Sequence, residues 1–157
     1  MKKELLLDKQ YQEASLHSFS KNCNAVVLGA SGGIGSALVE TLNSISHFNK
    51  VFGFSRASSF KFDLTDETSI EQAVNISTDD GDIRLVIDAT GFLHSKDQSP
   101  EKSWRELNAD QLTRAFAINT IGPALLMKHF LPRLPRSGKA VFATLSARVG
   151  SIEDNQL

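Results

Sequence analysis

Four glycines within residues 29–35 have the spacing that most clearly indicates chemistry in this sequence. They follow an apolar run, residues 25–28, and lead into a segment with helical periodicity, residues 34–46. A strand, a glycine turn and a helix in this order present backbone N–H groups to a phosphate, and glycine lets a ligand approach the main chain. The sequence therefore predicts a phosphate-binding turn. The alternative is that the glycines serve only a tight turn.

The spacing Gly29-x-x-x-Gly33-x-Gly35 differs from two common phosphate-binding motifs. It is not the G-x-G-x-x-G dinucleotide fingerprint, and it is not a P-loop, because no Lys-Ser or Lys-Thr pair follows the glycines. A metal site is not expected either. Neither His94 nor His129 has a cysteine or a second histidine at ligand spacing, so we assign both to loop or helix-surface roles.

Alternating strand-like and helix-like segments must position the glycine turn. The predicted strands are residues 25–28, 50–55, 60–62, 83–89 and 139–145. The predicted helices are residues 34–46, residues 65–74 with Thr65 as N-cap, a short helix opened by Ser99-Pro100, and residues 108–131 with a kink at Gly122-Pro123. This alternation predicts an α/β fold, a doubly wound parallel sheet with Rossmann-type topology.

Length and composition limit the class of protein. The 157 residues suffice for one domain, placed at residues 23–157 after a polar extension, residues 1–22, that we expect to be poorly ordered. A net charge of −1 gives no reason to expect nucleic acid or a membrane surface as a partner. No run approaches the roughly 18 apolar residues of a membrane span. Cys23 is the only cysteine, which suits a reducing compartment, so we expect a cytoplasmic protein.

Three further features join the glycine turn in an order that resembles the short-chain dehydrogenase/reductase family. Asp88-Ala89-Thr90-Gly91 closes the predicted fourth strand, where the family usually has Asn-Asn-Ala-Gly. Asn119, followed by Gly122 and Pro123, matches the helical asparagine of the family. Ser146 follows the last predicted strand, where the family places its catalytic serine. The runs 122–126 and 146–151 look most like the C-factor-like subgroup.

The resemblance implies reversible hydride transfer between a nicotinamide cofactor and a carbonyl or alcohol. The cofactor-binding residues that it implies are Gly29, Ser31, Gly32, Gly33, Ile34, Gly35, Ser55, Arg56, Asp63, Leu64, Ala89, Thr90 and Gly91. Asp63 would contact the adenine ring. The alternative for Asp63 is a turn residue before Thr65.

The end of the second predicted strand bears on the choice of cofactor. A site for NAD normally has an acid there, about 20 residues beyond the glycines, to bind the ribose 2′-OH. This chain has Ser55-Arg56 instead. Because a guanidinium matches a phosphate in charge and geometry, we expect NADP in preference to NAD. The alternative is an Arg56 that is simply solvated.

The same resemblance assigns catalytic roles. Ser146 would bind the substrate carbonyl and the developing oxyanion, and Asn119 would hold a water or a helix carbonyl in a proton relay. The acid–base catalyst of the family is a tyrosine in a Tyr-x-x-x-Lys motif, about a dozen residues beyond the serine. The only tyrosine of this chain is Tyr11, with Ser15 four residues later. We therefore expect a chain truncated before that motif, with negligible turnover on its own.

Three functions remain as alternatives. The first is an oxidoreductase that acts on a small-molecule carbonyl substrate once completed. The second is a non-catalytic dinucleotide-binding module. The third, a methyltransferase-like domain, explains neither Asn119 nor Ser146. Family members commonly pair through the helix that corresponds to residues 108–131, so the resemblance also implies a homo-oligomer through this helix.

Overall fold

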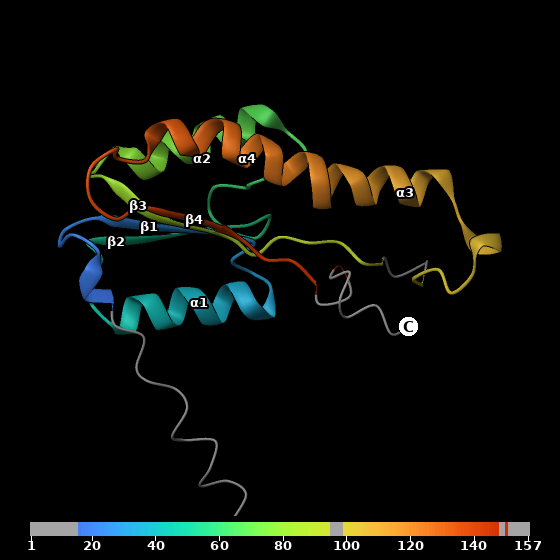
Figure 1. Ribbon diagram of the computed structural model, residues 1–157, viewed down its shortest axis with the longest axis horizontal. Helices are drawn as coiled ribbons and strands as arrows, with labels where there is room; N and C mark the ends of the chain where they lie inside the picture. The colour runs from blue at the N-terminus through green and yellow to red at the C-terminus, as the bar shows by residue number, and fades with distance from the viewer. Residues whose placement is uncertain (1–15, 95–98, 148–149, 151–157) are drawn as a thin grey trace, which may run out of the picture.

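Four parallel strands form a single sheet in the order β2-β1-β3-β4 (Figure 1). The computed structural model describes residues 16–94, 99–147 and 150. The strands are β1 (Asn24–Leu28), β2 (Lys50–Phe54), β3 (Ile83–Asp88) and β4 (Val141–Thr144). The chain turns to one side of β1 to form β2 and to the other side to form β3. The strand order therefore reverses between β1 and β3, and the doubly wound α/β fold is confirmed.

Helices cover both faces of the sheet (Figure 1). One face carries α1 (Gly33–Ser44), and the other carries α2 (Glu67–Thr78) and α4 (Gly122–Phe130). The remaining α-helix, α3 (Ala109–Phe116), extends beyond the end of the sheet. Short 3₁₀-helices form at Leu16–Ser18, Trp104–Glu106 and Leu131–Arg133. No helix within the described residues has the length and apolar character needed to span a membrane.

The central strand β1 is buried along its whole length because both of its faces are covered. Its Val26 and Leu28 side chains pack in one core cluster with residues of α2 and α4, among them Ile70 and Phe130. The alternate residues Ala25 and Val27 belong to a second cluster that includes Leu42 of α1. The apolar run 25–28 thus supplies both cores.

The predicted strand at residues 60–62 is wrong, since only an isolated bridge between Ser55 and Lys61 forms there. The Ser58 hydroxyl donates to the carbonyls of Ser55 and Phe60, at 2.7 and 2.5 Å, and these bonds close a compact loop. The predicted N-cap, Thr65, is also wrong. The side chain of Asp66 caps α2 by accepting from the Thr68 N–H, and α2 runs on to Thr78.

The predicted helix over residues 108–131 is divided. Asn108 caps α3, a π-helical turn (Ala117–Ile121) follows, and α4 begins at Gly122. Pro123 lacks an N–H group, so the regular bonding pattern changes next to it. The short helix expected from Ser99-Pro100 starts later, as the 3₁₀-helix Trp104–Glu106.

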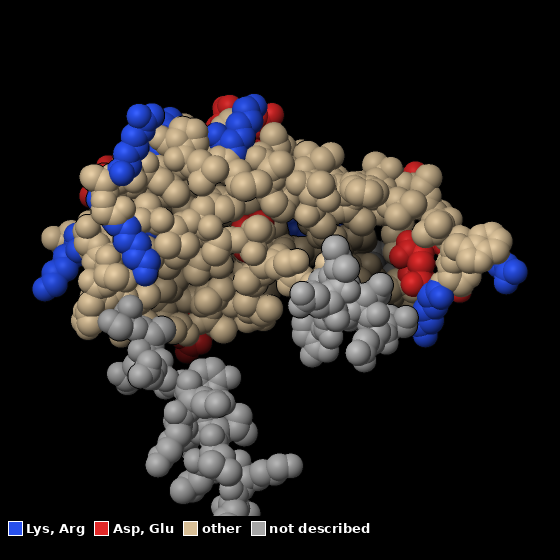
Figure 2. Space-filling view, viewed as in Figure 1, with Lys and Arg blue, Asp and Glu red and all other residues tan. Residues whose placement is uncertain are grey.

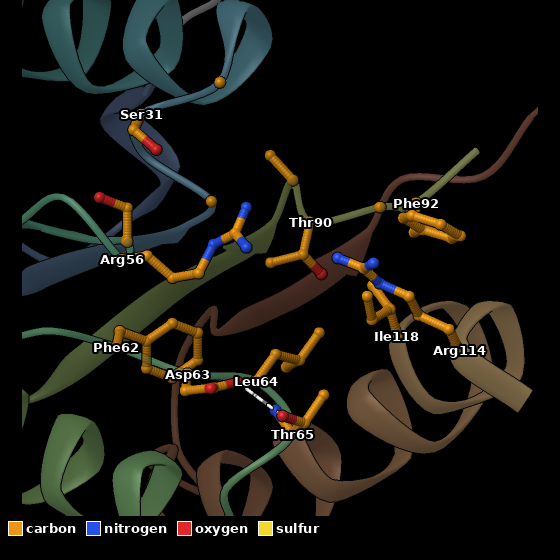
Figure 3. A pocket seen from close by; sticks show the side chains of 15 residues that line it. Ser31, Arg56, Phe62, Asp63, Leu64, Thr65, Thr90, Phe92, Arg114 and Ile118 are labelled. Carbon is orange, nitrogen blue, oxygen red and sulfur yellow. Dashed lines mark hydrogen bonds between the residues drawn. The ribbon is translucent and has the colours of Figure 1, made fainter. Parts of the chain in front are cut away.

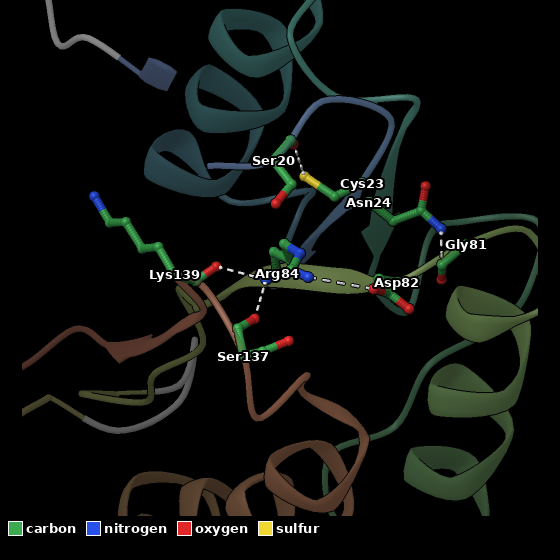
Figure 4. A network of polar contacts seen from close by, with 8 residues as sticks. All are labelled: Ser20, Cys23, Asn24, Gly81, Asp82, Arg84, Ser137 and Lys139. Carbon is green, nitrogen blue, oxygen red and sulfur yellow. Dashed lines mark hydrogen bonds and ion pairs between the residues drawn. The ribbon is translucent and has the colours of Figure 1, made fainter. Parts of the chain in front are cut away.

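A buried arginine fixes the loop that leads into β4 (Figure 4). Arg84 of β3 donates to the carbonyls of Ser137, at 2.8 Å, and Lys139, at 3.3 Å, and pairs with Asp82. Gly138, between the two carbonyls, has a φ of +75°, which favours glycine. These contacts hold β4 beside β3 at the sheet edge.

The packed part of the chain begins before the boundary predicted at residue 23. Residues 1–15 of the predicted extension lie outside the described residues. Phe19 is buried, and its ring centroid lies 5.8 Å from that of Phe48. Part of the segment 16–22 therefore contributes to the core next to α1.

Candidate functional site

A cavity of about 240 Å³ opens at the carboxyl ends of the strands (Figure 3). Its position coincides with the reversal of strand order between β1 and β3, where α/β sheets bind ligands. The residues that line it are Gly29, Ser31, Gly32, Ser55, Arg56, Phe62, Asp63, Leu64, Thr65, Ala89, Thr90, Gly91, Phe92, Arg114 and Ile118. All of the predicted cofactor residues are among them except Gly33, Ile34 and Gly35, which form the start of α1.

Two glycines of the turn are required by close backbone contacts. Gly29 has a φ of +82°, and a Cβ at this position would lie 2.7 Å from the carbonyl oxygen of Ala89. A Cβ on Gly35 would overlap the Gly29 carbonyl. By contrast, nothing lies within 4 Å of the Cβ position of Gly33. The turn is therefore tightly packed at Gly29 and Gly35 and open at Gly33.

The N-terminus of α1 is open to an anion. Its N-cap residue, Gly32, provides no side-chain hydrogen bond, and its first turn contains no acid. The helices α2 and α3 are both capped by side chains, those of Asp66 and Asn108. Ile34, in the first turn of α1, is 63% exposed. The unpaired N–H groups and the helix dipole at this end favour a negatively charged ligand.

A tight turn after β2 directs Arg56 toward the cavity (Figure 3). Ser55 is buried, its hydroxyl accepts from the Ala57 N–H at 3.2 Å, and its own N–H donates to the Ser58 hydroxyl at 3.0 Å. The position after β2 therefore carries a guanidinium where an NAD-selective site would carry an acid.

Asp63 both turns the chain and faces the cavity. Its Oδ1 accepts from the N–H of Thr65 at 2.9 Å and from the Thr65 hydroxyl at 2.7 Å. These hydrogen bonds, backbone first, lower the pKa of Asp63 below its usual 3.8, so the carboxylate is ionised at neutral pH. Asp63 thus makes the turn that was the alternative interpretation, and it also lines the cavity.

The end of β3 is organised by a buried carboxylate. Asp88 is 1% exposed. Its Oδ1 accepts from the N–H of Thr90, at 3.0 Å, and from the Thr90 hydroxyl, at 2.5 Å. Its Oδ2 accepts from the Thr144 hydroxyl at 3.0 Å. Asp88 therefore fixes Thr90 on the cavity wall and links β3 to the end of β4.

The predicted catalytic residues do not line the cavity. Asn119, in the π-helical turn, donates through Nδ2 to the carbonyl of Phe92 at 2.6 Å and accepts through Oδ1 from the Phe92 N–H at 2.8 Å. Its amide thus holds the loop after β3. Ser146 is exposed, two residues beyond β4, at the same edge of the sheet as the cavity. The Leu145 N–H donates to the Asp88 carbonyl at 3.0 Å, which continues the strand pairing to the residue before Ser146.

Five residues of the lining were not predicted: Phe62, Thr65, Phe92, Arg114 and Ile118. Phe62, Thr65 and Phe92 adjoin predicted site residues, so a wider window around each motif would have included them. Ile118 precedes Asn119, and Arg114 is four residues before Ile118, a spacing that places two helical side chains on one face. That spacing is the only signal for Arg114 in the sequence.

A group of side chains with metal-ligand chemistry lies away from the cavity, between α2 and α4. Ligand atoms of Glu67, Glu71 and His129 lie within 4.8 Å of one another. Glu67 is already paired, with Lys128 at 2.5 Å and with His129 Nε2 at 2.7 Å. We assign this group to the contact between the two helices.

Comparison with known proteins finds a matching family model and solved structures of similar fold. A family model described as enoyl-(acyl carrier protein) reductase matches residues 29–157. An NADPH-bound carbonyl reductase from chicken fatty liver is 22% identical, with a TM-score of 0.72, over 89% of this chain and 63% of that one. Ligand-free aldohexose dehydrogenase from Thermoplasma acidophilum is 21% identical, with a TM-score of 0.69, over 84% of this chain and 52% of that one.

A short-chain dehydrogenase/reductase from Serratia marcescens is 22% identical, with a TM-score of 0.62, over 75% of this chain and 53% of that one. At these identities the similarity shows the fold alone. The chain spans little more than half the length of most of these structures. A comparison with curated proteins found no match.

Proposed function

Because the chain belongs to the short-chain dehydrogenase/reductase family, we propose that its cavity binds a nicotinamide dinucleotide, with NADP preferred over NAD. The observation that carries the proposal is the uncapped N-terminus of α1 beside the glycine turn. The open position at Gly33 leaves room for a ligand next to the main chain. The pyrophosphate would lie at this helix end, and the adenosine half would enter the cavity.

The size of the cavity supports the placement of only the adenosine half of the dinucleotide inside it. About 240 Å³ is less than the roughly 300–1,000 Å³ of pockets that enclose a whole drug-sized ligand, so it suits one end of a dinucleotide. Asp63 and Leu64 form one wall and Ala89 to Gly91 form the other. Arg56 in the lining supports the choice of NADP, because its guanidinium matches a 2′-phosphate.

The chemistry that follows from family membership is reversible reduction of a small carbonyl compound, with the bound nicotinamide supplying or accepting hydride. Ser146 donates a hydrogen bond to the substrate oxygen as negative charge develops there. Asn119 holds the loop at Phe92 and thereby maintains one wall of the dinucleotide site. Within these 157 residues the only tyrosine is Tyr11, so no Tyr-x-x-x-Lys pair is available to move the proton.

We therefore propose that the 157-residue chain binds the dinucleotide without appreciable turnover, as a catalytically incomplete reductase or as a non-catalytic binding module. Placement in the C-factor-like subgroup is supported by the runs 122–126 and 146–151, of which residues 148–149 and 151 lie outside the described residues. A cytoplasmic location is supported by the single, free cysteine, Cys23.

Binding is tested by calorimetric titration and by thermal melting with NADPH and NADH. NADPH at a hundredfold excess over its dissociation constant should stabilise the chain by about 2.7 kcal/mol. Replacing Arg56 by Gln should weaken the binding of NADPH by about tenfold, because a charge-assisted hydrogen bond is lost. The same substitution should leave the binding of NADH nearly unchanged. A wild-type chain that binds neither dinucleotide would disprove the proposal.

Turnover is tested by following NADPH absorbance with a panel of small aldehydes and ketones. We expect no oxidation above the rate without protein. Measurable carbonyl reduction by the purified chain would contradict the proposed inactivity, although it would leave the binding proposal intact.

A further inference from the structure

A second arginine reaches the cavity from the side opposite Arg56. Arg114 lies on α3, and its side chain lines the same cavity as Arg56, which follows β2. Figure 3 shows both guanidinium groups pointing toward Thr90, Arg56 from the β2 side and Arg114 from the helix side. Neither the glycine motif nor the motifs around Asn119 and Ser146 includes Arg114.

The Arg114 side chain is positioned by contacts that leave its charge available. Its guanidinium carbon lies 4.7 Å from the centroid of the Phe92 ring, a cation–π contact. The Phe92 backbone is in turn held by both amide atoms of Asn119. Among residues 16–94, 99–147 and 150, no carboxylate forms an ion pair with Arg114. A cation fixed on an aromatic ring and lacking a carboxylate partner there is ready to bind an anion.

The charge of the lining favours an anionic group. The charged residues of the lining are two arginines, Arg56 and Arg114, and one acid, Asp63. Arg56 interacts electrostatically with the Asp63 carboxylate, and the lining keeps a net positive charge. A phosphate monoester carries about −1.5 to −2 charges at pH 7. The 2′-phosphate is the group that distinguishes NADP from NAD, and it is such a monoester.

We infer that Arg114 is a second binding residue for the 2′-phosphate of NADP(H), which it shares with Arg56. This inference rests on the proposed function and adds a determinant of cofactor choice to it. Arg114 acts by direct charge-assisted hydrogen bonding, with Phe92 as the platform that orients it. The preference for NADP over NAD then depends on two elements, the β2 turn and α3.

The test measures dissociation constants of NADPH and NADH for the full 157-residue chain and its variants by calorimetry. Arg114→Gln should weaken the binding of NADPH by about tenfold or more, as expected for a lost hydrogen bond to a charged group. It should change NADH by less than twofold and reduce the dependence of NADPH binding on salt. Arg114→Lys should recover part of the loss, because the charge remains.

A matched control is Arg105→Gln. Arg105 also stacks on an aromatic ring, 4.8 Å from the centroid of Trp104, but it does not line the cavity. The Arg105→Gln substitution should leave the dissociation constants of both NADPH and NADH unchanged. Phe92→Leu retains the Arg114 charge without its platform and should weaken NADPH less than Arg114→Gln does. Melting temperatures of the unliganded variants check that each one folds.

The other outcomes overturn the inference in distinguishable ways. Equal weakening of NADPH and NADH by Arg114→Gln would mean that Arg114 contacts the part of the ligand that both share. An Arg114→Gln variant with wild-type affinities, beside an Arg56→Gln variant that loses NADPH, would refute the role of Arg114 and leave the proposed function standing. If the wild-type chain binds neither dinucleotide, both fail.

Discussion

Gly33 and Gly35 are two residues apart in the same turn, yet the space that a side chain would occupy differs between them. Gly35 is buried, and its Cβ position is occupied by the carbonyl of Gly29. Gly33 has no neighbour within 4 Å of its Cβ position. The absent side chain therefore serves packing at Gly35 and leaves space for a ligand at Gly33.

Alanine substitutions separate these two roles. Gly35→Ala should reduce the free energy of unfolding by about 1–3 kcal/mol, because an added methyl group in a packed site forces the backbone to shift. Gly33→Ala should leave the stability unchanged or slightly higher and should weaken NADPH binding. Chemical denaturation and calorimetry measure the two effects. Equal stability losses at both positions would contradict this division.

Asn119 shows how a residue predicted from a motif can have a different visible contact. Both of its side-chain amide atoms bind the backbone of Phe92, so this amide is engaged in holding the loop beside the cavity. The predicted relay role of Asn119 and the oxyanion role of Ser146 stay predictions.

At the level of elements, α2 and α4 are joined by an ion-pair cluster on the surface of the molecule. Glu67, at the start of α2, pairs with Lys128 and His129 of α4. Hydrogen bonding from Lys128 and then from His129 lowers the pKa of Glu67 below its usual 4.5. The bond to Glu67 raises the pKa of Lys128 above its usual 10.5.

The pH dependence of the stability that this cluster contributes follows from the lowered pKa of Glu67 and the raised pKa of Lys128. The stabilisation from Glu67 is fully present above pH 4.5 and is lost as the pH falls through the lowered pKa of the folded state. The part from Lys128 is present below pH 10.5 and is lost as the pH rises through its raised pKa. Glu67→Gln should therefore lower the melting temperature slightly at neutral pH, since exposed pairs contribute little.

The difference between Glu67→Gln and wild type should vanish in acid well below pH 4.5. Glu40→Gln is the control, because Glu40 is an exposed acid of α1 without an ion pair among the described residues. Thermal melts between pH 3 and pH 8 make the comparison. A difference that persists unchanged in acid would show that Glu67 acts through packing rather than charge.

At the scale of the whole molecule, the helical layer opposite α1 leaves large apolar side chains in contact with solvent. Phe116 at the end of α3 is 59% exposed, and Ile121 before α4 is 54% exposed. Figure 2 shows most Lys, Arg, Asp and Glu side chains toward the outline of the molecule, and the rest of this view is formed by uncharged residues, polar as well as apolar. Exposed apolar patches favour association, so we propose that copies of the chain pair through residues 108–131.

Phe116→Glu should shift the chain toward monomer, because a carboxylate in an apolar contact must be desolvated. Ile45→Glu is the control, since Ile45 is an exposed apolar residue at the end of α1, on the other face of the sheet. Sedimentation velocity over a range of concentrations measures the change. A wild-type chain that is monomeric throughout would exclude this interface.

The sequence by itself determined the α/β class, because the period of apolar residues and the alternation of strands and helices are local properties. Residues 25–28 gave the central strand, and the motifs at Gly29, Arg56, Asp63 and Thr90 marked most of the cavity wall. Gly29, Arg56 and Thr90 did so because they follow β1, β2 and β3, and parallel strands end at one edge of the sheet. Asp63 follows no strand, and it reaches the cavity from the loop that leads to α2.

Local patterns could not place what depends on contacts across the fold. The segment 60–62, with Phe60 and Phe62 on either side of Lys61, forms no strand, since hydrogen bonds of the Ser58 side chain close the loop there. The long helix contains a π-helical turn that brings Asn119 onto the Phe92 backbone. Arg114 joins Arg56 in one cavity although their elements are far apart in sequence. Only the tertiary structure decided that pairing, because it depends on how α3 packs relative to the end of the sheet and not on any periodicity of the chain.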